Sequence, residues 1–305
     1  MSAMAPPTRR RHSASTRSGS CRAGRPFRDS ISLSTYYRAE VDFSRSLVIA
    51  LSQSGRTPDV VGYARHARER GALTVAVTNE PESELAEAAE WTLPLHAGEE
   101  RAVAASKTLL NTFALLGLLA GVAAGRGEEV ADGVQACASM IEEALPGLEE
   151  AVAGIATTFA CVGRMYVIGR GIEFGTAREV ALKLTETCRI AAEPVTSTDL
   201  AHGPIAALDA MFPVWTIASR DECLPALIAA AALARRAGAT LVATGSAAAE
   251  VPDAAVRLPV PQAPLPVLSP LLSLVPGQLF ASALSRAKGL NADQPAGLTK
   301  ITLAE

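Results

Sequence analysis

The sequence predicts an α/β fold built as two tandem doubly wound parallel-sheet domains. Short apolar runs of the kind found in buried strands alternate with longer tracts of helical periodicity, and the whole pattern starts again near residue 160. Alanine dominates the apolar residues and aromatic residues make up only 4% of the chain, which suits small-residue helices packed on sheets. A chain of 305 residues is long enough for two domains, each with its own core.

The first half contains three strand-like runs and three predicted helices. The strands are expected at LVIAL (47–51), LTVAVTN (73–79) and 91–95, and the helices at 58–71, 102–124 and 128–157. Part of the second helical tract, residues 108–125, is apolar enough to be considered as a membrane span. It carries Asn111 and lies among strand–helix units, so a packed helix is the better interpretation.

The second half repeats this order. Strands are expected at 165–169, 214–218, 240–245 and 256–260, with helices at 176–190, 224–237 and 271–288. The repetition indicates a duplicated architecture, although no sequence repeat is visible. We therefore expect a first domain over 30–155 and a second domain over 156–305.

Residues 1–29 differ in character from the rest of the chain. They hold seven arginines against one acid and show no apolar periodicity, so we expect a disordered or mistranslated segment; a nucleic-acid-binding arm or a transit peptide is the alternative. The formal charge of −3 gives no global attraction to nucleic acid or to an anionic membrane, and neither is expected as a partner. The five cysteines lack metal-ligand spacing, which indicates free thiols, a cytoplasmic location and no metal or cofactor.

The segment LVIALSQSGRTPD (47–59) carries the clearest binding signal. A buried strand ends at Leu51, and a polar turn of hydroxyl and amide side chains follows. Thr57 is expected at the N-cap of the next helix, with Pro58 in its first position. Hydroxyls and backbone N–H groups at a helix N-terminus suit a phosphate. By composition alone, an ordinary polar turn is an equally good interpretation.

The string S-Q-S-G-x-T closely resembles the phosphate loop of the sugar isomerase (SIS) family, in particular the isomerase half of glucosamine-6-phosphate synthases. The resemblance implies flavodoxin-like SIS domains. It also implies that a sugar phosphate binds in this half, its phosphate on the turn and its sugar beside ERAVAASKT (100–108). The phosphate ligands would be Ser52, Gln53, Ser54 and Thr57, and the sugar-lining residues Val103 and Ala104.

A second segment, 178–209, resembles the same family over its whole length. Glu179, Lys183 and Glu186 recur at helical spacings of four and three, so they share one face of a helix. Taken alone, such spacing is typical of a solvated salt-bridge stripe. The resemblance instead implies that Glu186 moves a proton between C1 and C2 of the sugar and that Lys183 steadies the developing charge.

Two further residues match the family near the end of the chain. His202, in His-Gly-Pro, matches a histidine that opens the sugar ring and reaches into the neighbouring subunit's site, which implies a homodimer. Lys300, in the tail DQPAGLTKITLAE (293–305), matches a lysine that forms a Schiff base with the open-chain ketose. Without the resemblance, they would be a loop histidine and a surface lysine.

We expect the chain to depart from the synthases in lacking a glutaminase domain. It resembles glutaminase-free glucosamine-6-phosphate deaminases, which implies interconversion of glucosamine 6-phosphate-type aldoses and fructose 6-phosphate-type ketoses without a cofactor. The alternatives are a deglycase acting on fructosamine 6-phosphate and a non-catalytic sugar-phosphate sensor. The joint presence of Glu186, His202 and Lys300 favours an enzyme.

A second departure concerns the start of the first domain. SIS domains open with a helix and a strand that ends in a Gly-x-Gly-Ser-Ser-like loop, whereas the resemblance here begins only near Ser30. We therefore expect the first domain to be N-terminally incomplete and to bind sugar phosphate poorly. A frameshift or misplaced start upstream of Ser30 is our hypothesis for this difference.

Overall fold

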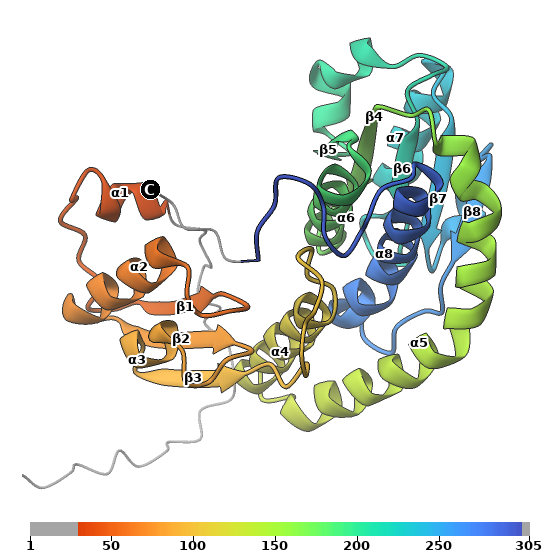
Figure 1. Cartoon of the computed structure of the whole chain (residues 1–305). Helices are drawn as coiled ribbons and strands as arrows, with labels where there is room; N and C mark the ends of the chain where they lie inside the picture. Colours follow the sequence, from red (N-terminus) through yellow and green to blue (C-terminus); the bar gives the residue numbers. More distant parts are fainter. Residues whose placement is uncertain (1–29, 301–305) are drawn as a thin grey trace, which may run out of the picture.

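The computed structural model describes residues 30–300 and confirms the α/β class with two separate parallel sheets (Figure 1). The predictions for residues 1–29, and the end of the tail at 301–305, lie outside the described residues. One unit is formed around each sheet, and two long helices lie between them in the sequence. These helices are α4 (Lys107–Ala123) and α5 (Gly127–Ala156).

The first sheet has three strands in the order β1-β2-β3, all parallel. Alternate residues of its strands, such as Ala50 and Ala76, pack against two helices on one face. Side chains on the opposite face, including Leu47 and Ile49, are exposed. The elements of this unit are α1 (Ile31–Thr35), β1 (Leu47–Leu51), α2 (Pro58–Glu69), β2 (Leu73–Thr78), α3 (Glu84–Ala88) and β3 (Trp91–Pro94).

The second sheet has five parallel strands in the order β5-β4-β6-β7-β8, which is the flavodoxin-like order. Its elements are β4 (Arg164–Gly169), α6 (Glu173–Cys188), β5 (Ala191–Thr196), β6 (Val214–Ile217), α7 (Leu224–Arg236), β7 (Leu241–Gly245), β8 (Val256–Pro259) and α8 (Ser269–Ala287). Short 3₁₀ turns follow α5 at Thr157–Phe159, β5 at Asp199–His202 and Pro204–Ala207, β7 at Ala248–Glu250, and β8 at Pro266–Leu268.

Alternating side chains of the second sheet build a core on each face. Met165, Val167 and Trp215 pack against α5, α6 and α8, whereas Tyr166 and Ile168 point to the face covered by α7. Both faces are therefore covered, as the continuous apolar strands predict. This unit is doubly wound, and its firmly packed α6 carries three of the residues that the sequence singled out.

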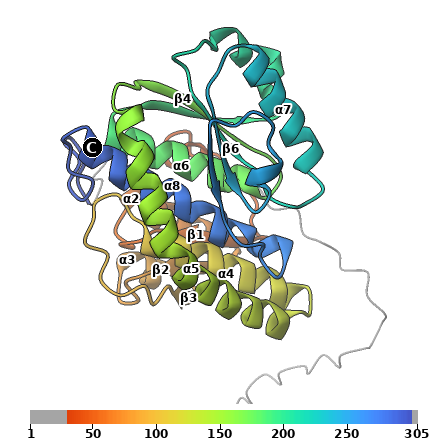
Figure 2. The same ribbon diagram turned by 90° about the vertical axis from the view of Figure 1, so that its right-hand side faces the viewer.

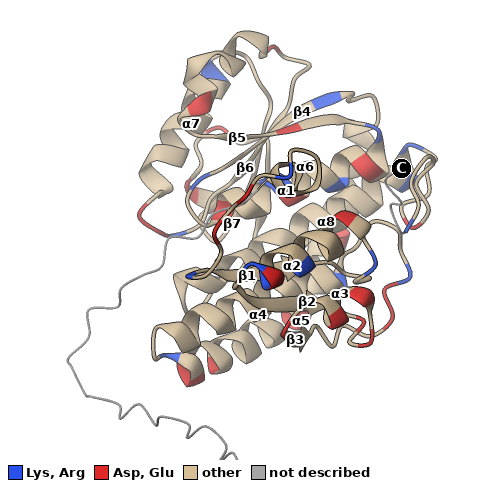
Figure 3. Ribbon diagram, turned by 90° about the vertical axis from the view of Figure 1, so that its left-hand side faces the viewer, with Lys and Arg blue, Asp and Glu red and all other residues tan. Residues whose placement is uncertain are grey.

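The two longest apolar tracts are packed helices. Of the described helices, α8, with the short turn before it, is the only one long and apolar enough to cross a membrane, and 72% of its most apolar 18 residues are buried. It packs against α5 and α6, as the view in Figure 2 shows. The sequence instead offered residues 108–125 as the possible membrane span and favoured a packed helix. These residues form most of α4, which packs on α5 and α8. Lys and Arg are interspersed with Asp and Glu over both units (Figure 3).

Candidate functional site

The turn between β1 and α2 gathers the predicted phosphate ligands at one helix N-terminus. Ser52 Oγ lies 3.3 Å from Thr57 Oγ1, and the Gly55 N–H donates to Ser52 Oγ over 3.2 Å. The Arg56 N–H donates to Ser54 Oγ over 3.3 Å. Thr57 is the N-cap residue of α2, and Pro58 occupies its first turn. Hydroxyl groups and the positive end of a helix thus meet in one place, which suits an anion.

Residues at and after the end of β2 fix the shape of this turn. The Gln53 carbonyl accepts the Asn79 N–H over 3.1 Å and the Thr78 hydroxyl over 3.2 Å. Gly55 has a φ of +62°, and a Cβ at this position would lie 2.0 Å from Ser83 Oγ. Only glycine fits such a backbone in such a small space. The turn is therefore held in shape without a ligand.

The loop before α4, which contains Val103 and Ala104, is anchored by a buried acid. Glu100 Oε2 accepts the backbone N–H groups of Ser106 and Thr108, each over 3.0 Å. Burial opposes the charged form of Glu100, but these hydrogen bonds and the nearby Lys107 outweigh it, so its pKa is lowered. The Val103 N–H donates to the Asp293 carbonyl over 2.9 Å, which ties the loop to the start of the C-terminal tail.

Glu179, Lys183 and Glu186 form a cluster on one face of α6. Lys183 Nζ lies 2.5 Å from Glu186 Oε2 and 3.3 Å from Glu179 Oε1. Only 7% of Lys183 is exposed. Burial raises the pKa of Glu179; Lys183 opposes this rise and the Glu186 charge adds to it. The cluster is sheltered from water and is not the solvated stripe that spacing alone would suggest.

Within this cluster, Glu186 has the most accessible side chain. Its side chain is 23% exposed, against 14% for Glu179 and 8% for Lys183. A carboxylate that is largely buried but still accessible, and that is paired with an ammonium group, can exchange a proton with a molecule docked on this face. Lys183 is close enough to the same place to stabilise negative charge there.

The other two predicted catalytic residues lie outside this cluster. His202 is exposed at the end of the 3₁₀ turn after β5, and Lys300 is exposed where the described chain ends. Within residues 30–300, no hydrogen bond or ion pair joins either residue to the α6 cluster. A single chain thus places the predicted site residues at five positions: the β1 turn, the loop before α4, the α6 face, the β5 turn and the tail.

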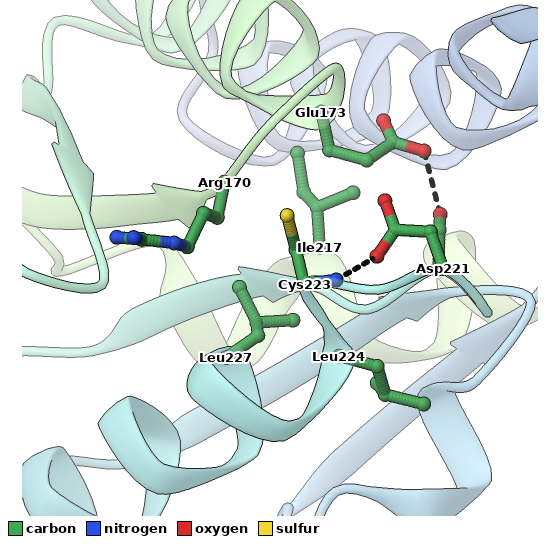
Figure 4. A pocket seen from close by; sticks show the side chains of 8 residues that line it. Arg170, Glu173, Ile217, Asp221, Cys223, Leu224 and Leu227 are labelled. Carbon is green, nitrogen blue, oxygen red and sulfur yellow. Dashed lines mark hydrogen bonds between the residues drawn. The ribbon is translucent and has the colours of Figure 1, made fainter. Parts of the chain in front are cut away.

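Sequence reasoning missed a small hollow of mixed polar and apolar lining at the carboxyl ends of β4 and β6 (Figure 4). Glu173, which is 2% exposed, is the buried acid at its edge. Glu173 Oε1 accepts the hydroxyls of Ser219, Ser269 and Ser273, and its Oε2 accepts that of Thr176. The sequence signal for this hollow was an acid, Glu173, within the Gly-rich turn 169–177. The burial of Glu173 could not be foreseen, because it depends on α8, which comes about a hundred residues later in the chain.

The two halves correspond residue by residue at the ends of two strands. Ser52 N–H donates to the Val77 carbonyl of β2, and Ala218 N–H donates to the Thr244 carbonyl of β7. The N-cap of the following helix comes five residues later in both halves, at Thr57 and at Cys223. The strands β1-β2-β3 thus correspond in order to β6-β7-β8.

Comparison with known proteins agrees with this duplicated architecture. The model of the SIS domain family matches residues 39–121 and 158–285. Glutamine–fructose-6-phosphate aminotransferase (isomerizing) from Corynebacterium glutamicum is 35% identical over 288 residues, a match that covers 88% of this chain. The chain spans 45% of the length of that relative.

Solved structures lead to the same family. The C-terminal domain of glucosamine-fructose-6-phosphate aminotransferase from Francisella tularensis matches with a TM-score of 0.79 and 25% identity, over 85% of this chain and 76% of that one. Glucosamine-6-phosphate deaminase from Thermotoga maritima shares the fold, with a TM-score of 0.70 and 22% identity, over 89% of this chain and 79% of that one. This chain belongs to the SIS domain family and is related to the phosphosugar isomerases and aminotransferase isomerase domains within it.

Proposed function

We propose that the chain is an aminosugar-phosphate deaminase/isomerase, which converts glucosamine 6-phosphate-type aldoses into fructose 6-phosphate-type ketoses and ammonia. The observation that carries the proposal is the sheltered pair of Lys183 and Glu186 on α6. Burying charged groups costs free energy, and a binding module has no need of a base at the sugar. The same chain also carries a turn whose hydroxyls and helix N-terminus suit a phosphate, which supports a site for both binding and proton transfer.

In this proposal the phosphate binds the β1 turn through Ser52, Gln53, Ser54 and Thr57, and the sugar lies along the loop of Val103 and Ala104. The hydroxyls and the N-terminus of α2 neutralise the phosphate without a lysine. These contacts are the same in the ground state and the transition state, so they set affinity and orientation.

Glu186 then acts as the base that moves a proton between C1 and C2, and Lys183 stabilises the enediol-like charge. Lys300 displaces ammonia from the C2 imine and so forms a Schiff base with the open-chain ketose. Water then hydrolyses this Schiff base and releases the ketose, so that ammonia and the ketose leave in separate steps. His202 opens the sugar ring. Deglycation of fructosamine 6-phosphate would use the same groups and differ in the nitrogen substituent that is released.

We also propose a cytoplasmic homodimer, in which His202 enters the site of the neighbouring subunit. His202 is exposed and is not joined to the α6 cluster within the described chain. Such a position is compatible with action in the site of the neighbouring subunit. The arrangement predicts complementation between two inactive variants, His202→Ala and Glu186→Gln. A mixed dimer would contain one intact site, so random reassociation should restore about a quarter of wild-type activity. No recovery in verified mixed dimers would place His202 in its own subunit's site.

The reaction is tested by measuring ammonia and ketose phosphate together. Purified protein would be incubated with glucosamine 6-phosphate, its epimers and fructosamine 6-phosphate, and both products would be followed by coupled assays. Equimolar ammonia and fructose 6-phosphate from glucosamine 6-phosphate are expected. Binding of these compounds with no turnover would favour a sugar-phosphate sensor, and release of a free amine from fructosamine 6-phosphate alone would favour the deglycase.

A further inference from the structure

Arg170 and the segment that carries His202 leave the second sheet side by side. In the register of β4 and β5, Gly169 lies opposite Thr196, so Arg170 and Ser197 are the next residues on neighbouring parallel strands. Arg170 Nη1 donates to Ser197 Oγ over 3.1 Å and also to Thr198 Oγ1. The Arg170 side chain points away from the other residues that line the hollow (Figure 4). One guanidinium group thus holds two consecutive residues of the segment that follows β5.

The segment from Thr196 to Gly203 is fixed at several points and ends in an exposed histidine. Thr196 Oγ1 donates to Asp199 Oδ2 over 2.7 Å, which closes a short turn, and Leu200 is fully buried beneath it. His202 is exposed, and Gly203 has a φ of +146°, which favours glycine. The backbone direction at His202 therefore depends on how the preceding residues are anchored. Leu200 anchors the segment to the core beneath it, and the side chain of Arg170 adds two hydrogen bonds from the end of β4.

Among the described residues, no acidic side chain draws Arg170 away from Ser197 and Thr198. Within residues 30–300 it forms no ion pair, and the nearby Glu173 carboxylate is occupied by four hydroxyl groups. Both hydrogen bonds come from one guanidinium nitrogen, Nη1, whose two N–H groups are fixed in the plane of the group. The N–H groups of a lysine ammonium rotate on a flexible stem, so they do not reproduce this fixed geometry. The arrangement therefore depends on arginine at this position and not only on a positive charge.

We propose that Arg170 is a positioning residue that sets the direction of His202 for sugar-ring opening. This inference rests on the proposed function, since it needs His202 to act on the ring. It predicts that loss of Arg170 harms the turnover of substrates that close into a ring and spares a substrate that cannot. It also predicts that lysine at this position does not restore function.

The test compares two ketose phosphates in the presence of ammonium. Fructose 6-phosphate closes into a ring, and 5-deoxyfructose 6-phosphate lacks the hydroxyl needed to do so. Arg170→Ala and Arg170→Lys should lower kcat for fructose 6-phosphate at least tenfold with KM within about twofold, while kcat for the 5-deoxy analogue stays at the wild-type value. Arg220→Ala is the matched control, because Arg220 follows β6 at the same sheet edge and binds Glu250 and the Ser246 carbonyl instead. It should leave both rates unchanged.

Hydrogen exchange gives a second readout that does not depend on activity. In Arg170→Ala, amides of residues 197–203 should exchange at least tenfold faster, while those of β4 keep their protection. Equal losses of kcat on both substrates, full rescue by lysine, or unchanged exchange at 197–203 would overturn the positioning role. A wild-type protein that turns over neither ketose would refute the proposed function, and the exchange result would still decide the role of Arg170 in holding the segment.

Discussion

The strands β1 and β6 occupy corresponding places in the two units but have very different surroundings. β6 pairs with β4 on one side and β7 on the other, and its Trp215 is fully buried. β1 pairs only with β2 among the described residues, and Leu47 and Leu51 are 57% and 44% exposed. An apolar strand sequence therefore does not determine its own burial. What decides it here is whether a second strand and a helix, such as β4 and α6, lie against it.

The turns that follow these strands also differ in chemistry. The first unit presents Ser52, Ser54 and Thr57, whereas the corresponding positions of the second unit hold Ala218, Arg220 and Cys223. Asp221 and Glu222 add two carboxylates to the second turn, which disfavours a phosphate there. The less covered unit thus has the turn suited to binding, and the well packed unit holds the charged cluster rigidly on α6.

The largest effect is expected from the α6 cluster. Glu186→Gln should lower kcat by roughly 10²- to 10⁴-fold, because it removes the base while keeping the shape of the side chain. Sugar-phosphate affinity, measured by calorimetry, should stay within about twofold of the wild-type value. Glu222→Gln is the control, since Glu222 is an exposed acid on the turn after β6. A Glu186→Gln variant that keeps more than a tenth of the wild-type rate would remove Glu186 from proton transfer.

The next prediction contrasts the packing of the two strands. Trp215→Ala should lower the free energy of unfolding by about 3–5 kcal/mol, because it empties a fully buried volume. Ile49→Ala at the open face of β1 should cost about 1 kcal/mol, since Ile49 is already 37% exposed. Urea unfolding of the two variants would measure the difference. Equal losses would show that β1 is covered in solution by something that the described residues do not include.

The third prediction separates the two turns by ligand affinity. Ser52→Ala and Thr57→Val should each raise KM for the sugar phosphate, with kcat little changed, because a lost charge-assisted hydrogen bond costs roughly 1.5–3 kcal/mol. That cost corresponds to roughly a 10- to 150-fold change in KM. Cys223→Ala, at the position that corresponds to Thr57, should leave KM unchanged. A larger effect from Cys223→Ala than from Thr57→Val would move the phosphate to the second unit.

The smallest effect concerns the loop between the two units. The lowered pKa of Glu100 means that its carboxylate stabilises the fold above its ordinary pKa of 4.5, and that this contribution is lost as the pH falls through the lowered value. Glu100→Gln should therefore reduce the free energy of unfolding by about 1 kcal/mol at pH 7. The difference from wild type should disappear in strong acid. A difference that persists unchanged at low pH would assign the effect to packing and not to charge.

The fold could be predicted from the sequence wherever a strand or helix carries its own pattern. The seven strands expected from 47–51 to 256–260 and the helices from 58–71 to 271–288 are present within a few residues of their expected bounds. β5 was missed because Glu193 and Pro194 interrupt its apolar pattern. It lies at the edge of the sheet, where proline is tolerated. The five-residue helices α1 and α3 were missed because they are too short to show a period.

The candidate site was predictable only in part. The helical spacing of Glu179, Lys183 and Glu186 correctly predicted that they share a face, but their burial depends on packing that spacing does not encode. The contact of Arg170 with Ser197 and Thr198 follows from the pairing of β4 with β5, and β5 was itself missed. The roles given to His202 and Lys300 came from family resemblance. They remain predictions, because no contact in the described chain joins either residue to the α6 cluster.

In the proposed function, the β1 turn and the α6 cluster serve a single sugar-phosphate site. Hydrogen exchange measured over a titration with glucosamine 6-phosphate tests this shared site most directly. We predict that amides of residues 52–57 and 183–190 gain protection with the same dissociation constant, while those of 218–223 do not change. Protection confined to one unit, different dissociation constants for the two segments, or protection of 218–223 would contradict a single shared site.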